Sequence, residues 1–150
     1  MARNRNPFET AVAALNRRAY SLSDLRERLQ ARGFDESEIE EALGRLIELG
    51  ELDDESYARL FAADKRDLAG WGPERIAAAL RERGVAAELI DRTCAESHQE
   101  QVVRAGALLL DRGTVLAEDA DRSRALGFLT RRGYPYEIAY DAIRLTGEGH

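Results

Sequence analysis

Apolar residues recur along this chain at intervals of three and four positions, the spacing that places them on one face of an α-helix. No stretch of useful length alternates with the two-residue period of a β-strand. One pattern occurs three times: an apolar helical run, a basic residue, a glycine, one hydrophobic residue, and a second apolar run. The chain is therefore predicted to be all-α, with about nine short helices.

The three copies align position by position, except that the second run of the third copy is shifted by about one residue. Gly84 follows Gly33 by 51 residues, and Gly133 follows Gly84 by 49. Repeats of this kind bury their apolar faces by stacking on their neighbours. The aligned positions are Leu25, Leu29, Arg32, Gly33, Phe34, Ile39 and Leu43; Ile76, Leu80, Arg83, Gly84, Val85, Ile90 and Cys94; and Ala125, Leu129, Arg132, Gly133, Tyr134, Ile138 and Ile143. We predict three tandem three-helix repeats, at residues 1–50, 51–97 and 98–150, in an elongated molecule.

Capping residues set the predicted helix boundaries. Glycines that follow an apolar run are expected to end helices in the left-handed conformation, as at Gly33 and Gly84. The predicted starts are Asn6 followed by Pro7, Ser21 with Asp24, Asp35 with Glu38, Asp53, Pro73, a position near Ala87, and Pro135. The polar segment 96–101 leaves open whether the sixth helix bends there or ends.

The fourth helix is expected to turn Tyr57, Leu60, Phe61 and Leu68 inward. Trp71 follows it between two glycines, where it either packs in the core or anchors a partner; we favour packing.

Composition indicates a helix-rich protein of ordinary domain length, with 150 residues, 44% hydrophobic and 33% charged. No apolar run is long enough to cross a membrane, and residues 1–6 lack the apolar segment of a signal peptide, so a cytoplasmic location is expected. Cys94 is the only cysteine, which excludes an internal disulfide and a multi-thiolate metal site; we expect it to be a small buried hydrophobic residue.

Charge is segregated along the chain, although the net charge is only −6. Residues 1–34 carry seven arginines and three acids, a net of +4, whereas residues 35–57 carry ten acids and one arginine, a net of −9. Such blocks either meet different partners or are solvated helix surfaces.

Catalytic and cofactor chemistry has little support in the sequence. His98 and His150 are the only histidines, and each is expected to be an isolated surface residue. Glycines stand singly at helix ends, so no phosphate-binding loop is predicted. The acidic clusters 53–55 and 118–121 adjoin predicted helix starts, where carboxylates cap backbone N–H groups. We expect no enzyme activity, no cofactor and no metal.

Arginines and large aromatic side chains remain as candidates for binding a partner. Several of the arginines also lie at helix C-termini, where a cation is favourable for structural reasons alone. The candidate residues are Arg17, Arg18, Arg26, Arg32, Tyr57, Lys65, Arg66, Trp71, Arg75, Arg131 and Arg132.

The order of short motifs resembles that of a known family. The motifs are Leu52-Asp53-Asp54, Tyr57-Ala58, Gly72-Pro73, Arg75-Ile76, Leu80, Arg83-Gly84-Val85, Phe128-Leu129, Arg131-Arg132-Gly133-Tyr134, and Tyr136-Glu137-Ile138. Together they resemble the RecX family of bacterial recombinase regulators, over about residues 10 to 145.

This resemblance implies a curved array of three-helix repeats without catalytic activity. It also implies a protein that lodges in the groove of the RecA filament and curbs filament growth, ATP hydrolysis, strand exchange and repressor cleavage in the SOS response to DNA damage. RecA is then the expected partner of a monomeric regulator, with at most weak contact to single- or double-stranded DNA.

Two other functions stay open. The first is a small helical DNA-binding protein, such as a transcriptional regulator, because tri-helical units can place a helix in a DNA groove. An overall pI near 5.1 and acidic third and sixth helices argue against strong DNA binding. The second is a helical scaffold for another partner.

Overall fold

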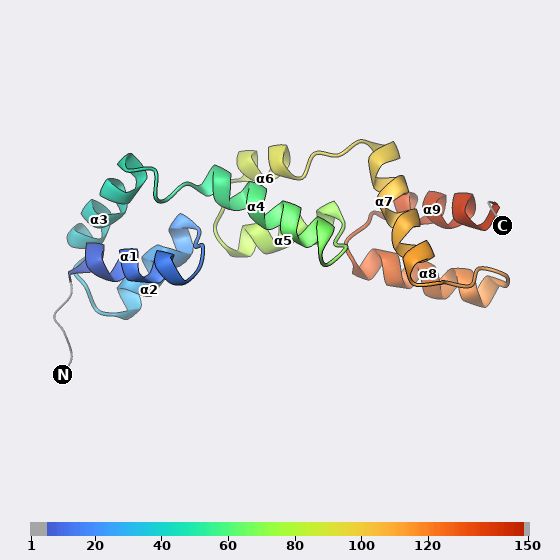
Figure 1. Ribbon diagram of the computed structural model, residues 1–150, viewed down its shortest axis with the longest axis horizontal. Coiled ribbons are helices and arrows are strands. Elements are labelled where there is room, and N and C mark those ends of the chain that lie inside the picture. The colour runs from blue at the N-terminus through green and yellow to red at the C-terminus, as the bar shows by residue number, and fades with distance from the viewer. Residues whose placement is uncertain (1–5, 149–150) are drawn as a thin grey trace. The chain divides into compact units, whose positions relative to one another are not determined.

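The computed structural model describes residues 6–148 (Figure 1). Residues 1–5, which hold most of the segment examined for a signal peptide, and His150 lie outside this range. The described residues are helical, without strands, which confirms the all-α prediction. The helices are α1 Pro7–Arg17, α2 Leu22–Ala31, α3 Glu36–Glu48, α4 Asp54–Asp67, α5 Pro73–Glu82, α6 Ala87–Thr93, α7 His98–Asp111, α8 Asp119–Arg131 and α9 Tyr136–Glu148.

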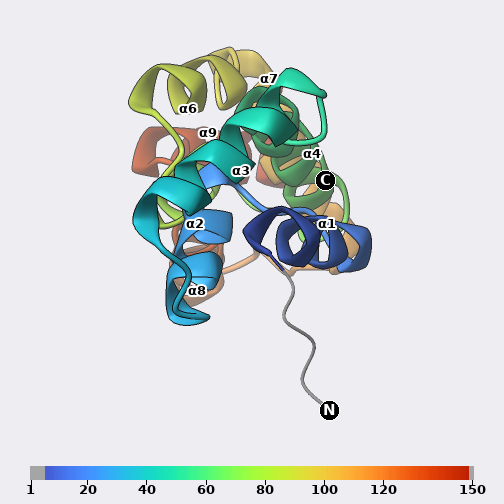
Figure 2. The same cartoon turned by 90° about the vertical axis from the view of Figure 1, so that its left-hand side faces the viewer.

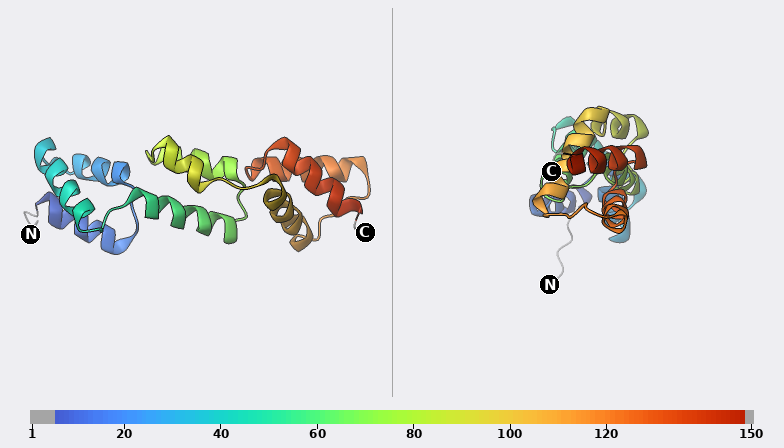
Figure 3. Two further views of the ribbon diagram at one scale, coloured as in Figure 1. Left: turned by 90° about the horizontal axis from the view of Figure 1, so that it is seen from above. Right: turned by 90° about the vertical axis from the view of Figure 1, so that its right-hand side faces the viewer.

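The chain forms two compact units, each of which we describe by itself. Unit 1 runs up to Leu60 and includes Leu80–Ile90, and unit 2 comprises Phe61–Ala79 and continues from Asp91. In unit 1, α3 packs on both α1 and α2 (Figure 2). In unit 2, α9 packs on both α7 and α8 (Figure 3). The proposed repeat boundaries at residues 50 and 97 stay a prediction.

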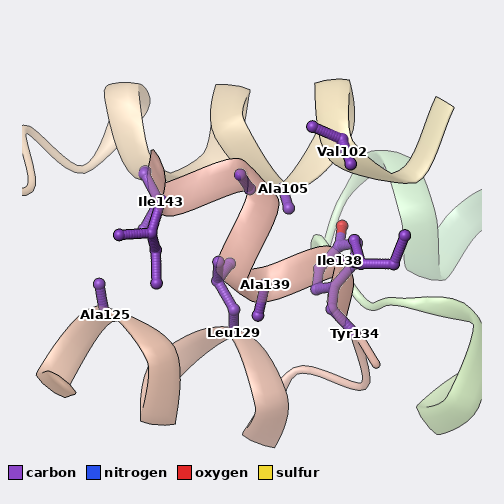
Figure 4. Packing of buried hydrophobic residues seen from close by; sticks show 10 residues of the cluster. Val102, Ala105, Ala125, Leu129, Tyr134, Ile138, Ala139 and Ile143 are labelled. Atoms are coloured by element: carbon purple, nitrogen blue, oxygen red, sulfur yellow. The ribbon is translucent and has the colours of Figure 1, made fainter. Parts of the chain in front are cut away.

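The repeated apolar positions form the cores of the units. Leu25 and Leu29 of the first copy are fully buried, and so are Ile76 and Leu80 of the second. In the third copy, Leu129 and Tyr134 face Ile138 and Ala139 of α9 (Figure 4). The smaller Ala125 is also buried, and the partly buried Leu126 and Phe128 pack against the same cluster. The predicted apolar repeat pattern is confirmed at these positions.

The predicted caps are mostly confirmed. The Asn6 side chain accepts a hydrogen bond from the Glu9 N–H at 2.8 Å, and Pro7 is the first residue of α1. The Asp35 prediction was wrong in detail, because Asp35 stands at the N-cap of α3 without a side-chain capping bond. Its carboxylate instead accepts from the nearby Ser37 hydroxyl at 2.7 Å.

The connection between α6 and α7 settles a question that the sequence left open. The sixth helix ends at Thr93, and a capping box starts α7. There the Ser97 hydroxyl accepts from the Glu100 N–H at 3.0 Å, while the Glu100 carboxylate accepts from the Ser97 N–H at 3.1 Å. The two helices are therefore separate.

The inward face of α4 was predicted wrongly. Leu60 and Leu68 are 64% and 81% exposed, whereas the small residues Ala58 and Ala62 are fully buried. Tyr57, like Phe61, is half-buried. Small residues therefore form the buried face of α4, and two of its large apolar residues are exposed.

In unit 1, the start of α2 docks on the turn that ends α5. The buried Ser21 hydroxyl donates to the Arg83 carbonyl at 2.6 Å and accepts from the Asp24 N–H at 3.2 Å, so both of its roles are satisfied. A Cβ on Gly84 would lie 2.4 Å from the Ser23 side chain. Gly84 has a φ of +75°, which confirms the predicted left-handed turn and leaves this position to glycine.

In unit 2, the start of α5 docks on the turn that ends α8 in the equivalent way. The Gly72 N–H donates to the Arg132 carbonyl at 2.7 Å, and the Glu74 N–H donates to the Gly133 carbonyl at 3.0 Å. A Cβ on Gly72 would lie 2.5 Å from the Gly133 backbone. Gly72 follows Ser21 by 51 residues, the same interval that separates Gly84 from Gly33. Equivalent positions of the repeat therefore form both junctions.

Candidate partner-binding surface

Three of the candidate arginines lie in unit 1 and are exposed and unpaired with acids. Arg17, Arg18 and Arg32 form no ion pair with any residue in the 6–148 range. The Arg18 guanidinium lies 3.7 Å from the ring centroid of Tyr20 and donates to the Ala19 carbonyl. This stacking holds one face of the guanidinium in place. These three side chains are available to a partner's carboxylates or phosphates.

Arg26 is committed within the protein instead. Its guanidinium donates to both carboxylate oxygens of Glu40, at 2.7 and 2.9 Å, in a bidentate pair. The hydrogen bond from Arg26 lowers the pKa of Glu40, and the same bond raises that of Arg26. The pair links α2 to α3 on the surface of unit 1.

Trp71 is the centre of an aromatic and cationic cluster in unit 2. It is half-buried, and its ring meets the Phe61 ring edge to face at a centroid distance of 6.3 Å. The Arg75 guanidinium lies 4.2 Å from the Trp71 ring centroid, and the Lys65 ammonium lies 5.0 Å from it. Trp71 therefore packs against Phe61, in line with the favoured prediction, and its ring also contacts two cations, Arg75 and Lys65.

Arg66 belongs to a buried polar network rather than to a surface. Glu96, whose side chain is only 8% exposed, accepts two hydrogen bonds from Arg104, both at 2.8 Å, and lies 3.6 Å from Arg66. Arg66 also donates to the Thr93 carbonyl at 2.5 Å. Arg104 continues the network to the Tyr134 hydroxyl at 3.1 Å. One carboxylate thus ties α7 to α4 and to the segment between α6 and α7.

The network shifts the pKa values of two of its members. Burial alone lowers the pKa of Arg104, but the hydrogen bonds and charge of Glu96 outweigh it, so the net shift is upward. Burial raises the pKa of the Tyr134 phenol, and the positive charge of Arg104 opposes that rise.

We expect unit 2 to lose stability in alkaline solution through Tyr134. Because its pKa is raised on folding, the protonated phenol favours the folded state. That contribution is complete below the ordinary tyrosine pKa of about 10 and is lost as the pH rises past it. Denaturant titrations between about pH 8 and pH 11 should show a smaller decline for Tyr134→Phe than for the parent. Equal declines would contradict the prediction.

The two arginines that end α8 differ in role. Arg132 donates to the Ala69 carbonyl and lies 4.9 Å from the Phe128 ring centroid, so it holds the turn before Trp71. Arg131 is exposed. The candidate residues therefore divide into an exposed group (Arg17, Arg18, Arg32, Arg131), the Trp71 cluster, the half-buried Tyr57, and the structural arginines Arg26, Arg66 and Arg132.

A groove between α8 and α9 was not predicted from the sequence. Tyr136 and Tyr140 are 62% and 54% exposed, and their rings stack at 6.4 Å. They line a cavity of about 400 Å³ together with Arg122 and Arg144. The signal in the sequence was the pair of tyrosines four residues apart, outside the apolar repeat positions.

Other polar residues have partners in the structure. His98 is exposed but lies 2.7 Å from the Asp141 carboxylate, so it is not isolated as expected. Asp53 accepts from the Glu55 N–H, and Asp54 accepts from the Leu22 N–H at 2.8 Å, which confirms capping at this acidic cluster. Cys94 is half-buried rather than buried. Within residues 6–148, no group of three or more His, Cys, Asp or Glu side chains is placed to hold a metal ion.

Comparison with known proteins identifies the family. Residues 8–46 match the model of the first three-helix domain of RecX, and residues 53–93 match that of the second. The regulatory protein RecX of one Thermus thermophilus strain is 39% identical over 143 residues, which cover 93% of this chain and 94% of that protein. The chain belongs to the RecX family. The Deinococcus radiodurans regulatory protein RecX is 38% identical over 92% of this chain and 67% of its own length.

Solved RecX structures share the fold. The crystal structure of RecX from Lactobacillus salivarius superposes with a TM-score of 0.83 at 18% identity, over 95% of both chains. A second RecX crystal structure gives a TM-score of 0.76 at 22% identity, over 92% of this chain and 70% of the other. These RecX structures support the three-helix repeat arrangement. No helix in the described part of this chain is long and apolar enough to cross a membrane.

Proposed function

We propose that this protein binds RecA nucleoprotein filaments and inhibits their recombinase, ATPase and coprotease activities, thereby modulating DNA repair and the SOS response. The observation that carries the proposal is the match, over nearly the whole chain, to proteins named regulatory protein RecX. A series of repeats suits a polymeric partner, because weak contacts to several subunits add up to firm binding.

The exposed arginines and the Trp71 cluster are the proposed contact residues. Arg17, Arg18 and Arg32 offer planar guanidinium groups without a carboxylate partner in the described residues. Trp71, flanked by Lys65 and Arg75, combines an aromatic surface with positive charge.

The direct test is titration of this protein into a single-strand-dependent ATPase assay with RecA from the same organism. Loss of hydrolysis well below one regulator per RecA subunit, with little binding to bare DNA, is the expected result. Unchanged hydrolysis would refute the proposal. In that case, DNA binding that falls steeply with salt would favour the DNA-binding alternative instead.

Replacing Arg17, Arg18 and Arg32 together by alanine is expected to weaken inhibition about tenfold, which corresponds to roughly 1.4 kcal/mol of binding free energy. Helix content by circular dichroism should stay unchanged, because the three side chains are exposed.

The matched control replaces three arginines that already pair with acids of their own chain, Arg26, Arg122 and Arg124, and so removes the same charge. Equal loss in both triple variants would show that only net charge matters and would remove the proposed contact role.

A further inference from the structure

The turn that ends α2 has equivalents at the ends of α5 and α8. The start of another helix packs on each of those two turns, whereas no described residue packs on the α2 turn in this way. Arg-Gly-hydrophobic turns end α2, α5 and α8, and all three glycines have positive φ, of 83°, 75° and 100°. At Gly84 and Gly133, a Cβ would meet the start of another helix at 2.4 Å. At Gly33, no atom of the described residues lies within 4 Å of that position.

The two occupants show what such a turn accepts. Each is the first turn of a helix, and each begins with a small residue, Ser21 before α2 or Gly72 before α5. Both donate to carbonyl groups that the ending helix leaves unpaired. The start of α2 donates the Ser21 hydroxyl to the Arg83 carbonyl, and the start of α5 donates two backbone N–H groups to the Arg132 and Gly133 carbonyls. The positive end of one helix dipole then faces the negative end of the other.

Within the described residues, the carbonyls of Arg32 and Gly33 accept no hydrogen bond. They are the positions equivalent to the acceptors of the other two turns. The α2 turn therefore has the backbone conformation, the acceptors and the space of the occupied turns.

A second copy of this chain does not supply the missing helix start. Among the second helices of the repeats, α2 and α5 already pack their N-termini on turns of this chain. Within the described residues this leaves α8, whose N-terminal N–H groups are capped by its own side chains. Its N-cap is the larger residue Glu118, whose N–H already donates to the Asp121 carboxylate at 3.1 Å. Asp119 and Asp121 also place negative charge where the carbonyls of the α2 turn would lie.

We propose that the turn Arg32–Gly33–Phe34 is a docking site for the first turn of a helix on the protein partner, one that begins with serine or glycine. The partner contributes N–H or hydroxyl donors to the Arg32 and Gly33 carbonyls, and its small first residue approaches the Gly33 Cα. The inference rests on the proposed function, because the partner used to test it is the RecA filament.

The test compares Gly33→Asn with Gly50→Asn in the RecA ATPase titration. Both glycines have positive φ and nothing described within 4 Å of the Cβ position, and asparagine tolerates this conformation best among the other residues. Gly33→Asn should raise the concentration needed for half-inhibition at least tenfold, because its side chain blocks close approach. Gly50→Asn should match the parent. Equal inhibition by all three proteins, or equal loss in both variants, would overturn the proposal.

Hydrogen exchange of the parent protein gives a second readout that needs no variant. Amides in the segment 30–35 should exchange at least threefold more slowly when RecA filaments are present, and those in 48–52 should not change. If the parent inhibits RecA but the amides at 30–35 gain no protection, the docking site is overturned and the proposed function stands. No inhibition by the parent would refute the proposed function itself.

Discussion

The Gly72→Ala variant is expected to melt roughly 5–12 °C below the parent protein, which corresponds to about 2–4 kcal/mol of lost stability. The added methyl group would lie 2.5 Å from the Gly133 carbonyl carbon and oxygen, which are backbone atoms and cannot turn aside as a side chain would. Moving the start of α5 away also weakens the hydrogen bonds to Arg132 and Gly133, each worth about 1 kcal/mol. Thermal denaturation followed by circular dichroism measures the effect.

The matched control is Gly44→Ala, which adds the same methyl group to α3. Nothing described lies within 4 Å of that Cβ position, and alanine favours a helix interior over glycine. Gly44→Ala should therefore raise stability by about 0.5–1 kcal/mol. If both variants changed stability in the same direction, the close contact between position 72 and the Gly133 backbone would not explain the effect of Gly72→Ala.

The Glu96→Ala variant is expected to lose about 2–4 kcal/mol of stability. Glu96 is the only carboxylate paired with Arg66 and Arg104 within the described residues, and both arginine side chains are three-quarters or more buried. Without Glu96, two positive charges would remain in unit 2 with little water to solvate them. Urea denaturation of the variant and the parent gives the difference in free energy of unfolding.

Glu40→Ala serves as the control, because it breaks a bidentate arginine pair with similar distances on the surface. The Glu40 and Arg26 side chains are 48% and 34% exposed, so water replaces much of what is lost. Its effect should stay below about 1 kcal/mol. A Glu40→Ala effect as large as that of Glu96→Ala would mean that burial does not set the strength of these pairs.

The parts of the fold that depend on neighbouring residues could be predicted from the sequence. Asn6 with Pro7 begins α1 as expected, because a helix start requires only a side-chain acceptor a few residues from its donors. Gly33 and Gly84 end helices in the left-handed conformation for an equally local reason. The apolar repeat positions could also be predicted, because three copies of one pattern align along the chain.

The parts that depend on distant residues could not be predicted. The exposure of Leu60 and Leu68 was missed because the prediction favoured large apolar side chains, whereas the smaller Ala58 and Ala62 form the buried face of α4. The roles of Arg66 and Arg132 were missed for a similar reason. Their partners lie 27 and 63 residues away, at the Thr93 and Ala69 carbonyls, and charge patterns along the sequence do not indicate such pairings.

The candidate surface was predicted in part. Arg17, Arg18 and Arg32 were singled out as arginines, and the structure leaves them exposed, but their role in binding stays a prediction. The tyrosine groove between α8 and α9 was missed, because Tyr140 becomes notable only when its neighbours on α8 are known.

The bond between Ser21 and Arg83 affects how the protein folds during synthesis. Sixty-two residues separate its two ends, so the start of α2 lacks this partner until α5 and the turn after it have left the ribosome. Unit 1 also includes Leu80–Ile90, which follow in the chain well after Gly50. A fragment cut at Gly50 would lose both the acceptor of the Ser21 hydroxyl and the turn that packs against the start of α2, so a stable N-terminal fragment should end near residue 90.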